Sequence, residues 1–213
     1  MIANQLINNE KRTLPENCIN IIWAGSLIKL KRVDLLAKAF SKIIKKYPNS
    51  HLTIIGEGPE HENIEAILKE GAVIGSYTIM NYVDNSELRD IMKQADIYVF
   101  PSNGSEGWGA VVNEAMSEEC AVVASSKVGA TSMIRHKINS MIFKNGQIES
   151  LVEQLDLLIS DPNFLRSIKL NAKETIMNEW NPDTAAYRFI NIYNEIQTDP
   201  QFRLDNIDLL KLL

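Results

Sequence analysis

The chain has 213 residues, a formal net charge of -5 and 45% hydrophobic residues, which suits a globular protein with a substantial core. The negative charge disfavours a dedicated nucleic-acid binder. No run of about 18 apolar residues occurs and the N-terminus lacks a signal-peptide core, so we expect a cytoplasmic protein. Cys18 and Cys120 lie far apart beside apolar runs and are expected to be buried free thiols.

Short apolar runs alternate with helical patterns along most of the chain. Residues 1–17 are predicted to form an arm or linker, residues 18–198 the folded domain and residues 199–213 a tail. In chain order, the first predicted elements are the strand Ile19–Ala24, the helix Val33–Lys46, the strand Leu52–Ile55, a helix from Pro59 to Gly71, a less regular strand in Val73–Met80 interrupted by Gly75, and a helix capped near Asp84. They are followed by the strand Ile97–Phe100, a helix that carries Glu114, the strands Ala121–Ala124 and Met141–Phe143, and three helices starting near Ile148, Pro162 and Pro182.

Strands that are apolar throughout and alternate with helices predict a parallel sheet covered on both faces. The expected fold class is therefore α/β, a doubly wound parallel sheet of about six strands with a helical C-terminal end. Such sheets bind ligands outside the carboxyl ends of their strands, near the point where the strand order reverses. Loops that follow predicted strands should converge on that edge, namely those at Gly25, Gly56, Pro101–Gly109 and Gly129.

The stretch Pro101–Gly109 combines a preceding strand, three glycines and a following helix. The backbone N–H groups at a helix start can bind a phosphate, and glycines let a ligand approach closely. Glu106 and Glu114 can accept hydrogen bonds from sugar hydroxyls. Together these features predict a site for a nucleotide sugar. An ordinary strand–turn–helix with Glu114 on a solvated face is the alternative, which the three glycines and the second glutamate disfavour.

Basic residues gather after the first predicted strand, at Lys29, Lys31 and Arg32. A solvated cluster and a diphosphate clamp are both compatible with this pattern, and Lys31 is the preferred clamp. The turn that begins at Gly56 is not a dinucleotide fingerprint, because His61 stands where the last glycine would be. Whether that turn touches a ligand stays open.

Three scattered histidines and the absence of a DxD pair argue against a metal site. Trp23 and Trp180 are expected to be packing residues, and Trp108 belongs either to the core or to the site. The basic helix end at Lys42–Lys46 is expected to interact with the helix dipole. Peripheral membrane association is the less favoured alternative for this segment and for the tail.

Several segments carry a resemblance in the same order along the chain. Gly25-Ser26-Leu27 with Lys31 resembles "GRL…K", and Leu52–Pro59 resembles "L.IIGdGP". Pro101–Gly109 with Glu114-Ala115-Met116 is similar to "PS..EGfG…lEAM". In this respect the chain resembles the C-terminal, nucleotide-sugar-binding half of a GT-B glycosyltransferase of the retaining family GT4, with the Rossmann-like fold of that half.

The resemblance implies a role for each matching residue. Glu114 would bind the ribose, and Glu106 would contact the transferred sugar beside the backbone of Gly107, Trp108 and Gly109. Lys31 would balance the charge of the leaving diphosphate, so Lys31 and Glu106 are the expected catalytic residues. The remaining expected substrate-binding residues are Gly25, Ser26 and Gly56 at the first two strand ends and Asn81, Tyr82 and Val83 beside the base.

Further expectations concern partners and cofactors. The donor would be a nucleotide diphosphate sugar, used without a metal or other cofactor. The acceptor would be a glycan or lipid-linked sugar of surface polysaccharide synthesis, at the inner face of the plasma membrane. An N-terminal domain that this chain lacks would bind the acceptor, so the chain alone is predicted to be inactive.

Ser26 departs from the family pattern, which has an arginine there, and Asn81, Lys137 and Ser140 replace glycines. The Ser26 departure supports a second hypothesis, a degenerate, non-catalytic lobe that serves as a binding or regulatory module. A third hypothesis is another enzyme on the same type of sheet, such as a sugar-nucleotide epimerase.

Overall fold

A fully parallel sheet lies at the centre of the computed structural model, which describes residues 18–72, 74–105 and 107–198. Within this part the sheet has six strands in the order β3-β2-β1-β4-β5-β6. Predictions for residues 1–17, Val73, Glu106 and 199–213 lie outside the described residues. The strands are β1 (Ile19–Ala24), β2 (Ser50–Ile55), β3 (Tyr77–Met80), β4 (Ile97–Phe100), β5 (Ala121–Ser125) and β6 (Met141–Phe143).

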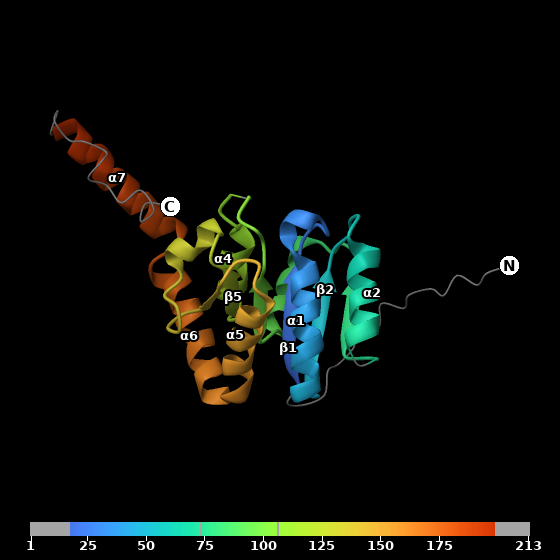
Figure 1. Ribbon diagram of the computed structural model, residues 1–213. Helices are drawn as coiled ribbons and strands as arrows, with labels where there is room; N and C mark the ends of the chain where they lie inside the picture. Colours follow the sequence, from blue (N-terminus) through green and yellow to red (C-terminus); the bar gives the residue numbers. More distant parts are fainter. Residues whose placement is uncertain (1–17, 73, 106, 199–213) are drawn as a thin grey trace.

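Helices cover both faces of the sheet, as the doubly wound prediction requires (Figure 1). They are α1 (Val33–Lys46), α2 (His61–Gly71), α3 (Asn85–Lys93), α4 (Ala110–Ser117), α5 (Ile148–Ser160), α6 (Pro162–Asn178) and α7 (Pro182–Thr198). Two short 3-10 helices, Lys29–Lys31 and Gly129–Met133, were not predicted.

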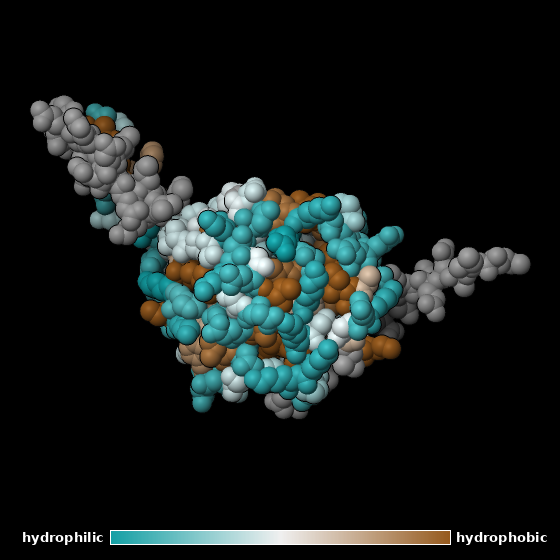
Figure 2. All heavy atoms as spheres, viewed as in Figure 1, coloured by the Kyte–Doolittle hydropathy of each residue, from teal (hydrophilic) through white to brown (hydrophobic). Residues whose placement is uncertain are grey.

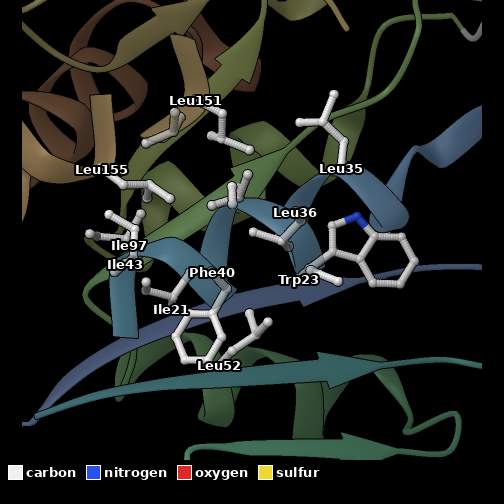
Figure 3. Packing of buried hydrophobic residues seen from close by; sticks show 14 of the residues in the cluster. Ile21, Trp23, Leu35, Leu36, Phe40, Ile43, Leu52, Ile97, Leu151 and Leu155 are labelled. Carbon is white, nitrogen blue, oxygen red and sulfur yellow. The ribbon is translucent and has the colours of Figure 1, made fainter. Parts of the chain in front are cut away.

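Alternate residues of β1 enter two separate apolar clusters, because successive side chains of a strand point to opposite faces. Ile21 and Trp23 pack beneath α1, α2 and α5. Ile22 and Ala24 belong to the cluster on the other face, with side chains of α4 and the C-terminal part of α6. Figure 3 shows the first cluster, where Trp23, Phe40 and Leu155 come from three different elements. Burial on both faces explains why β1 is apolar along almost its whole length.

Several element boundaries follow the local signals in the sequence. The Asp84 carboxylate accepts hydrogen bonds from the backbone N–H groups of Ser86 and Glu87, both at 2.9 Å, and so caps α3 as predicted. Asp161 caps α6 in the same way, with Pro162 at the first helical position. These polar contacts satisfy N–H groups that a helix start leaves without an intrahelical partner.

Other boundaries differ from the prediction. β3 begins at Tyr77 rather than Val73, because residues 74–76 form a turn with Gly75 at a φ of 85°. β2 begins two residues early, at Ser50, and α2 begins at His61, after Pro59. Cys120 is buried as expected, but Cys18 is only partly buried, so that prediction was wrong for Cys18.

The lysines at the end of α1 form pairs with acidic side chains of α5. Lys42 pairs with Glu149, and Lys46 lies 2.6 Å from Asp156, which also accepts a hydrogen bond from the Tyr47 hydroxyl. Figure 2 shows the corresponding face covered largely by hydrophilic side chains. These partners favour a structural role for the basic helix end over membrane attachment.

α7 extends away from the rest of the protein (Figure 1). Its exposed apolar side chains include Phe189, which is 71% exposed, together with Tyr187, Ile190, Tyr193 and Ile196. Among the described residues, none of the helices has the length and apolar character that crossing a membrane requires.

A buried polar network fixes the end of α6 to the segment before β6. The Asn139 side chain accepts a hydrogen bond from the Arg135 backbone N–H at 2.7 Å. Its amide donates to the Met133 carbonyl and to the Thr175 hydroxyl, at 3.1 and 3.0 Å. Because Asn139 and Thr175 are buried, water cannot easily replace these bonds.

The Asn139→Ala variant should therefore lose stability. Removing the side chain leaves buried donors and acceptors unpaired, and we expect the free energy of unfolding to fall by about 1–3 kcal/mol. Urea titration followed by circular dichroism measures the change. Asn163→Ala, on the exposed first turn of α6, is the control and should be nearly neutral.

Candidate functional site at the carboxyl edge of the sheet

The strand order reverses between β1 and β4, which lie side by side at the centre of the sheet. The chain leaves β1 toward β2 and β3 on one side, whereas β4 is followed by β5 and β6 on the other. The loops after β1 and β4 therefore flank the crevice in which sheets of this type bind ligands. Gly25 and Ser26 are exposed at the end of β1.

Hydrogen bonds join these two loops directly. The backbone N–H of Asn103 donates to the Leu30 carbonyl at 3.1 Å, and the Ser102 hydroxyl donates to the same oxygen at 3.3 Å. The expected convergence of the loops on one edge is thereby confirmed for the segments after β1 and β4.

The turn after β2 packs closely against the loop after β1. Gly25 N–H donates to the Ile55 carbonyl, and a Cβ on Gly56 would lie only 1.8 Å from the Gly25 oxygen. A Cβ on Gly58 would likewise lie 2.4 Å from the Leu27 oxygen. Both glycines thus permit contact between two backbones. This geometry gives Gly56 a packing role, and its contact with a ligand stays a prediction.

The glycine-rich loop after β4 is held at several points. Gly104 and Gly109 have φ values of 88° and 85°, in the left-handed region that glycine adopts without strain. A Cβ on Gly109 would lie 2.8 Å from the Phe100 ring, and one on Gly104 would lie 2.4 Å from the Lys127 oxygen. Gly107 is different, because a Cβ there would meet nothing within 4 Å. The loop therefore presents open backbone at Gly107, just before α4 begins.

Lys31 is the basic residue that approaches the base of this loop. Its ammonium lies 5.9 Å from the centroid of the Phe100 ring, the same ring that packs against Gly109. Arg32 instead pairs with Asp34, at 3.0 Å between Nε and Oδ1. Among the three clustered cations, the geometry thus brings Lys31 to the edge and engages Arg32 elsewhere.

Glu114 lies on α4, partly buried, and the Glu106 prediction falls outside the described residues. The neighbouring Asn113 accepts a hydrogen bond from Trp108 Nε1 at 2.8 Å. The Trp108 ring also contacts Trp180, with ring centroids 5.2 Å apart. Trp108 is therefore partly packed and at the same time part of the candidate loop, which combines the two alternatives that the sequence left open.

The segment Asn81–Val83 follows β3, two strands away from β1. Asn81 and Tyr82 are exposed and Val83 is partly buried. Strand spacing places this segment about 14 Å from the end of β4. The segment is therefore at the carboxyl edge, as predicted, but it does not adjoin the glycine-rich loop.

The sequence did not indicate three residues that shape the site, Phe100, Asn113 and Trp180, whereas Gly129 was expected near the edge. A Cβ on Gly129 would lie 3.0 Å from the Gly107 oxygen and 3.2 Å from the Trp108 Cα, so this glycine packs against the loop. The position of Gly129 after a predicted strand was the only signal for its contribution. Phe100 and Trp180 had no signal beyond their apolar character.

Among the described residues, this edge has neither a metal-binding cluster nor a cysteine. Within residues 18–72, 74–105 and 107–198, no group of three or more His, Cys, Asp or Glu side chains is arranged to hold a metal ion. Cys120 precedes β5, at the opposite edge of the sheet. Burial raises the pKa of its thiol to about 12, so the thiol stays protonated and unreactive.

The strand order defines a Rossmann-like domain, and its candidate site lies at the carboxyl edge where such sheets bind ligands. Residues 4–175 match the family described as Glycosyl transferases group 1, and the chain belongs to this family. The resemblance to the C-terminal domain of a GT-B glycosyltransferase is thereby confirmed.

Known proteins support the same family and fold. An uncharacterized glycosyltransferase of Haemophilus influenzae is 30% identical over 181 residues, a match covering 81% of this chain and 50% of the relative. The chain spans about half the length of relatives of this kind.

Two solved structures show the fold. The C-terminal domain of a glycosyl transferase group 1 family protein (LpcC) from Francisella tularensis has a TM-score of 0.72 at 24% identity, covering 77% of this chain and 87% of that one. A mutant of Staphylococcus aureus TarM, solved in complex with Fondaparinux, alpha-GlcNAc-glycerol and UDP, has a TM-score of 0.73 at 20% identity, covering 87% and 38%.

The Gly56→Ala variant tests the close contact between the first two strand ends. A methyl group at this position would collide with the Gly25 carbonyl at a φ that favours glycine, so stability should fall by about 3 kcal/mol or more. The urea midpoint measures the loss. Gly107→Ala is the control, because its methyl group would enter open space, and a comparable loss in both variants would contradict the packing argument.

Proposed function

We propose that the chain is the donor-binding half of a glycosyltransferase that moves a sugar from a nucleotide diphosphate sugar to a glycan or lipid-linked acceptor. The observation that carries this proposal is the convergence of an open helix start, at Gly107–Ala110, with Lys31 at the switch point of the sheet. A helix start and a cation together favour a diphosphate. Membership of the glycosyltransferase family supports a sugar as the group attached to it.

The arrangement of the edge suits an elongated ligand. The base would lie toward Asn81–Val83 and the ribose beside Glu114, and the diphosphate would lie between the loop after β1 and the helix start of α4. The sugar would then lie beside Gly107–Gly109 and Glu106. The UDP in the TarM structure supports a nucleoside diphosphate as the leaving group.

Each polar residue would have a separate task in this pose. Glu114 would accept hydrogen bonds from the ribose hydroxyls, and Glu106 would do the same for the transferred sugar. Lys31 and the loop N–H groups would stabilise the negative charge that grows on the diphosphate as its bond to the sugar breaks. No metal is part of this proposal, since the cation and the helix start supply the positive charge.

The finer parts of the proposal rest on the GT4 resemblance. They are retention of the anomeric configuration, a role in surface polysaccharide synthesis and a place at the inner face of the plasma membrane. The acceptor would bind a second domain, and this chain alone would not transfer sugar.

The second candidate is a non-catalytic lobe that binds a partner or regulates one. Ser26 favours it, because it stands at the exposed end of β1 where the family pattern has an arginine. The two candidates differ in whether the edge binds a nucleotide.

Titration with UDP, GDP and ADP tests the proposed site. At about a hundred times its dissociation constant, the correct nucleotide should stabilise the chain by roughly 2.7 kcal/mol, measured by thermal unfolding. Glu114→Ala should abolish this stabilisation, whereas Glu118→Ala, further along the same segment, should retain it. If none of the three nucleotides stabilises either this chain or the full-length protein, the donor-binding proposal is wrong.

Lys31→Met in the full-length protein tests the electrostatic step. Loss of the cation should lower kcat by about 10²–10³-fold, the size expected for removing one group that stabilises a transition state. Lys69→Met removes an equal charge from the exposed surface of α2 and is the control. Equal activity of the two variants in a sugar-transfer assay would exclude Lys31 from catalysis.

A further inference from the structure

Two tryptophans connect the glycine-rich loop with the joint between α6 and α7. The Trp108 and Trp180 ring centroids are 5.2 Å apart, with the planes tilted by 33°. At this separation, aromatic pairs favour offset or tilted arrangements over a face-to-face stack. Trp180 lies between Asn178, where α6 ends, and Pro182, where α7 begins.

The Trp108 ring is also held from α4. Its Nε1 donates to Asn113 Oδ1 at 2.8 Å, one residue before Glu114. The backbone at Trp108 lies against Gly129, where a Cβ would be 3.2 Å from the Trp108 Cα. Trp108 therefore makes contacts with Asn113, Gly129 and Trp180, of which Trp180 comes from the most distant part of the chain.

Trp180 itself is well anchored. Its backbone N–H donates to the Thr175 carbonyl at 3.2 Å, and the Thr175 hydroxyl belongs to the buried network around Asn139. Asn181 follows, donating from its side chain to the Met177 carbonyl and accepting from the Thr184 backbone N–H. The joint that carries Trp180 is thus a fixed support against which Trp108 can rest.

We propose that Trp180 is a positioning residue for the donor loop. By packing on Trp108, it holds the backbone N–H groups of Gly107–Gly109 in the orientation that a diphosphate requires. The affinity for a nucleoside diphosphate then depends on a side chain that does not touch the ligand. The choice of a nucleoside diphosphate as the ligand rests on the proposed function. The prediction that Trp180 orders the loop does not.

Trp180→Leu and Trp180→Phe separate this role from general packing. Leucine keeps an apolar side chain but removes the aromatic partner, and phenylalanine retains a ring. Hydrogen–deuterium exchange of the amides in residues 107–113, without nucleotide, measures loop order. We expect exchange to rise about three- to tenfold in Trp180→Leu, the range for loss of one aromatic pair, and to stay near wild type in Trp180→Phe.

The second readout is the affinity for UDP, GDP or ADP, whichever binds the wild-type chain. Trp180→Leu should weaken it by about three- to tenfold, and Trp180→Phe should restore it. The control is Leu155→Ala, which removes a fully buried side chain of α5 on the opposite face of the sheet. It should lower global stability but leave both loop exchange and affinity unchanged at temperatures well below unfolding.

The outcomes distinguish the two proposals. Unchanged loop exchange in Trp180→Leu, or an equal rise in Leu155→Ala, overturns the positioning role. Unchanged nucleotide affinity in Trp180→Leu also overturns it. If no nucleotide binds the wild-type protein, the proposed function fails, and the exchange experiment still decides whether Trp180 orders the loop.

Discussion

The close approach of two backbones, at Gly25 and Gly56, is the constraint on which the rest of the edge depends. No side chain fits between them, so the turn after β2 lies directly against the loop after β1. That loop in turn binds Asn103 and Ser102 through the Leu30 carbonyl. Backbone contacts between neighbouring loops therefore form most of the candidate site. They fix the positions of the loop N–H groups before any ligand binds. Such preorganisation makes electrostatic stabilisation effective, because little reorganisation remains when charge develops.

Local signals made most of the fold predictable. Apolar runs marked the six strands, and Asp84 and Pro162 marked two helix starts through local preferences that involve only neighbouring residues. Boundaries set by tertiary contacts or by a single turn were less predictable. Gly75, with its positive φ, delays β3 to Tyr77, although the residues before it have strand-like composition. Cys18 is partly exposed because it lies just before β1 rather than within the sheet.

The part of the candidate site that consists of loops at strand ends was predictable from the sequence. The topological rule placed the loops at Gly25, Gly56 and Gly107 on one edge, and the structure brings them there. The rule contains no information on side chains that approach from elsewhere. Trp180 reaches the loop from the end of α6, and Phe100 lies beneath Gly109 and Lys31, so only the folded chain shows their contribution.

Among the described strands, β1 comes first in the sequence but lies in the middle of the sheet, so the order of synthesis within this domain differs from the order in space. A nascent chain that has emerged from the ribosome as far as β3 can form β3-β2-β1, but the other edge of β1 stays open until β4 follows. The apolar cluster beneath α1 closes later still, because Leu151 and Leu155 come from α5. Open strand edges and exposed apolar surface favour aggregation of partly folded chains. The fold that gathers the candidate-site loops at its centre thereby leaves apolar surface of the growing domain uncovered until α5 has been translated.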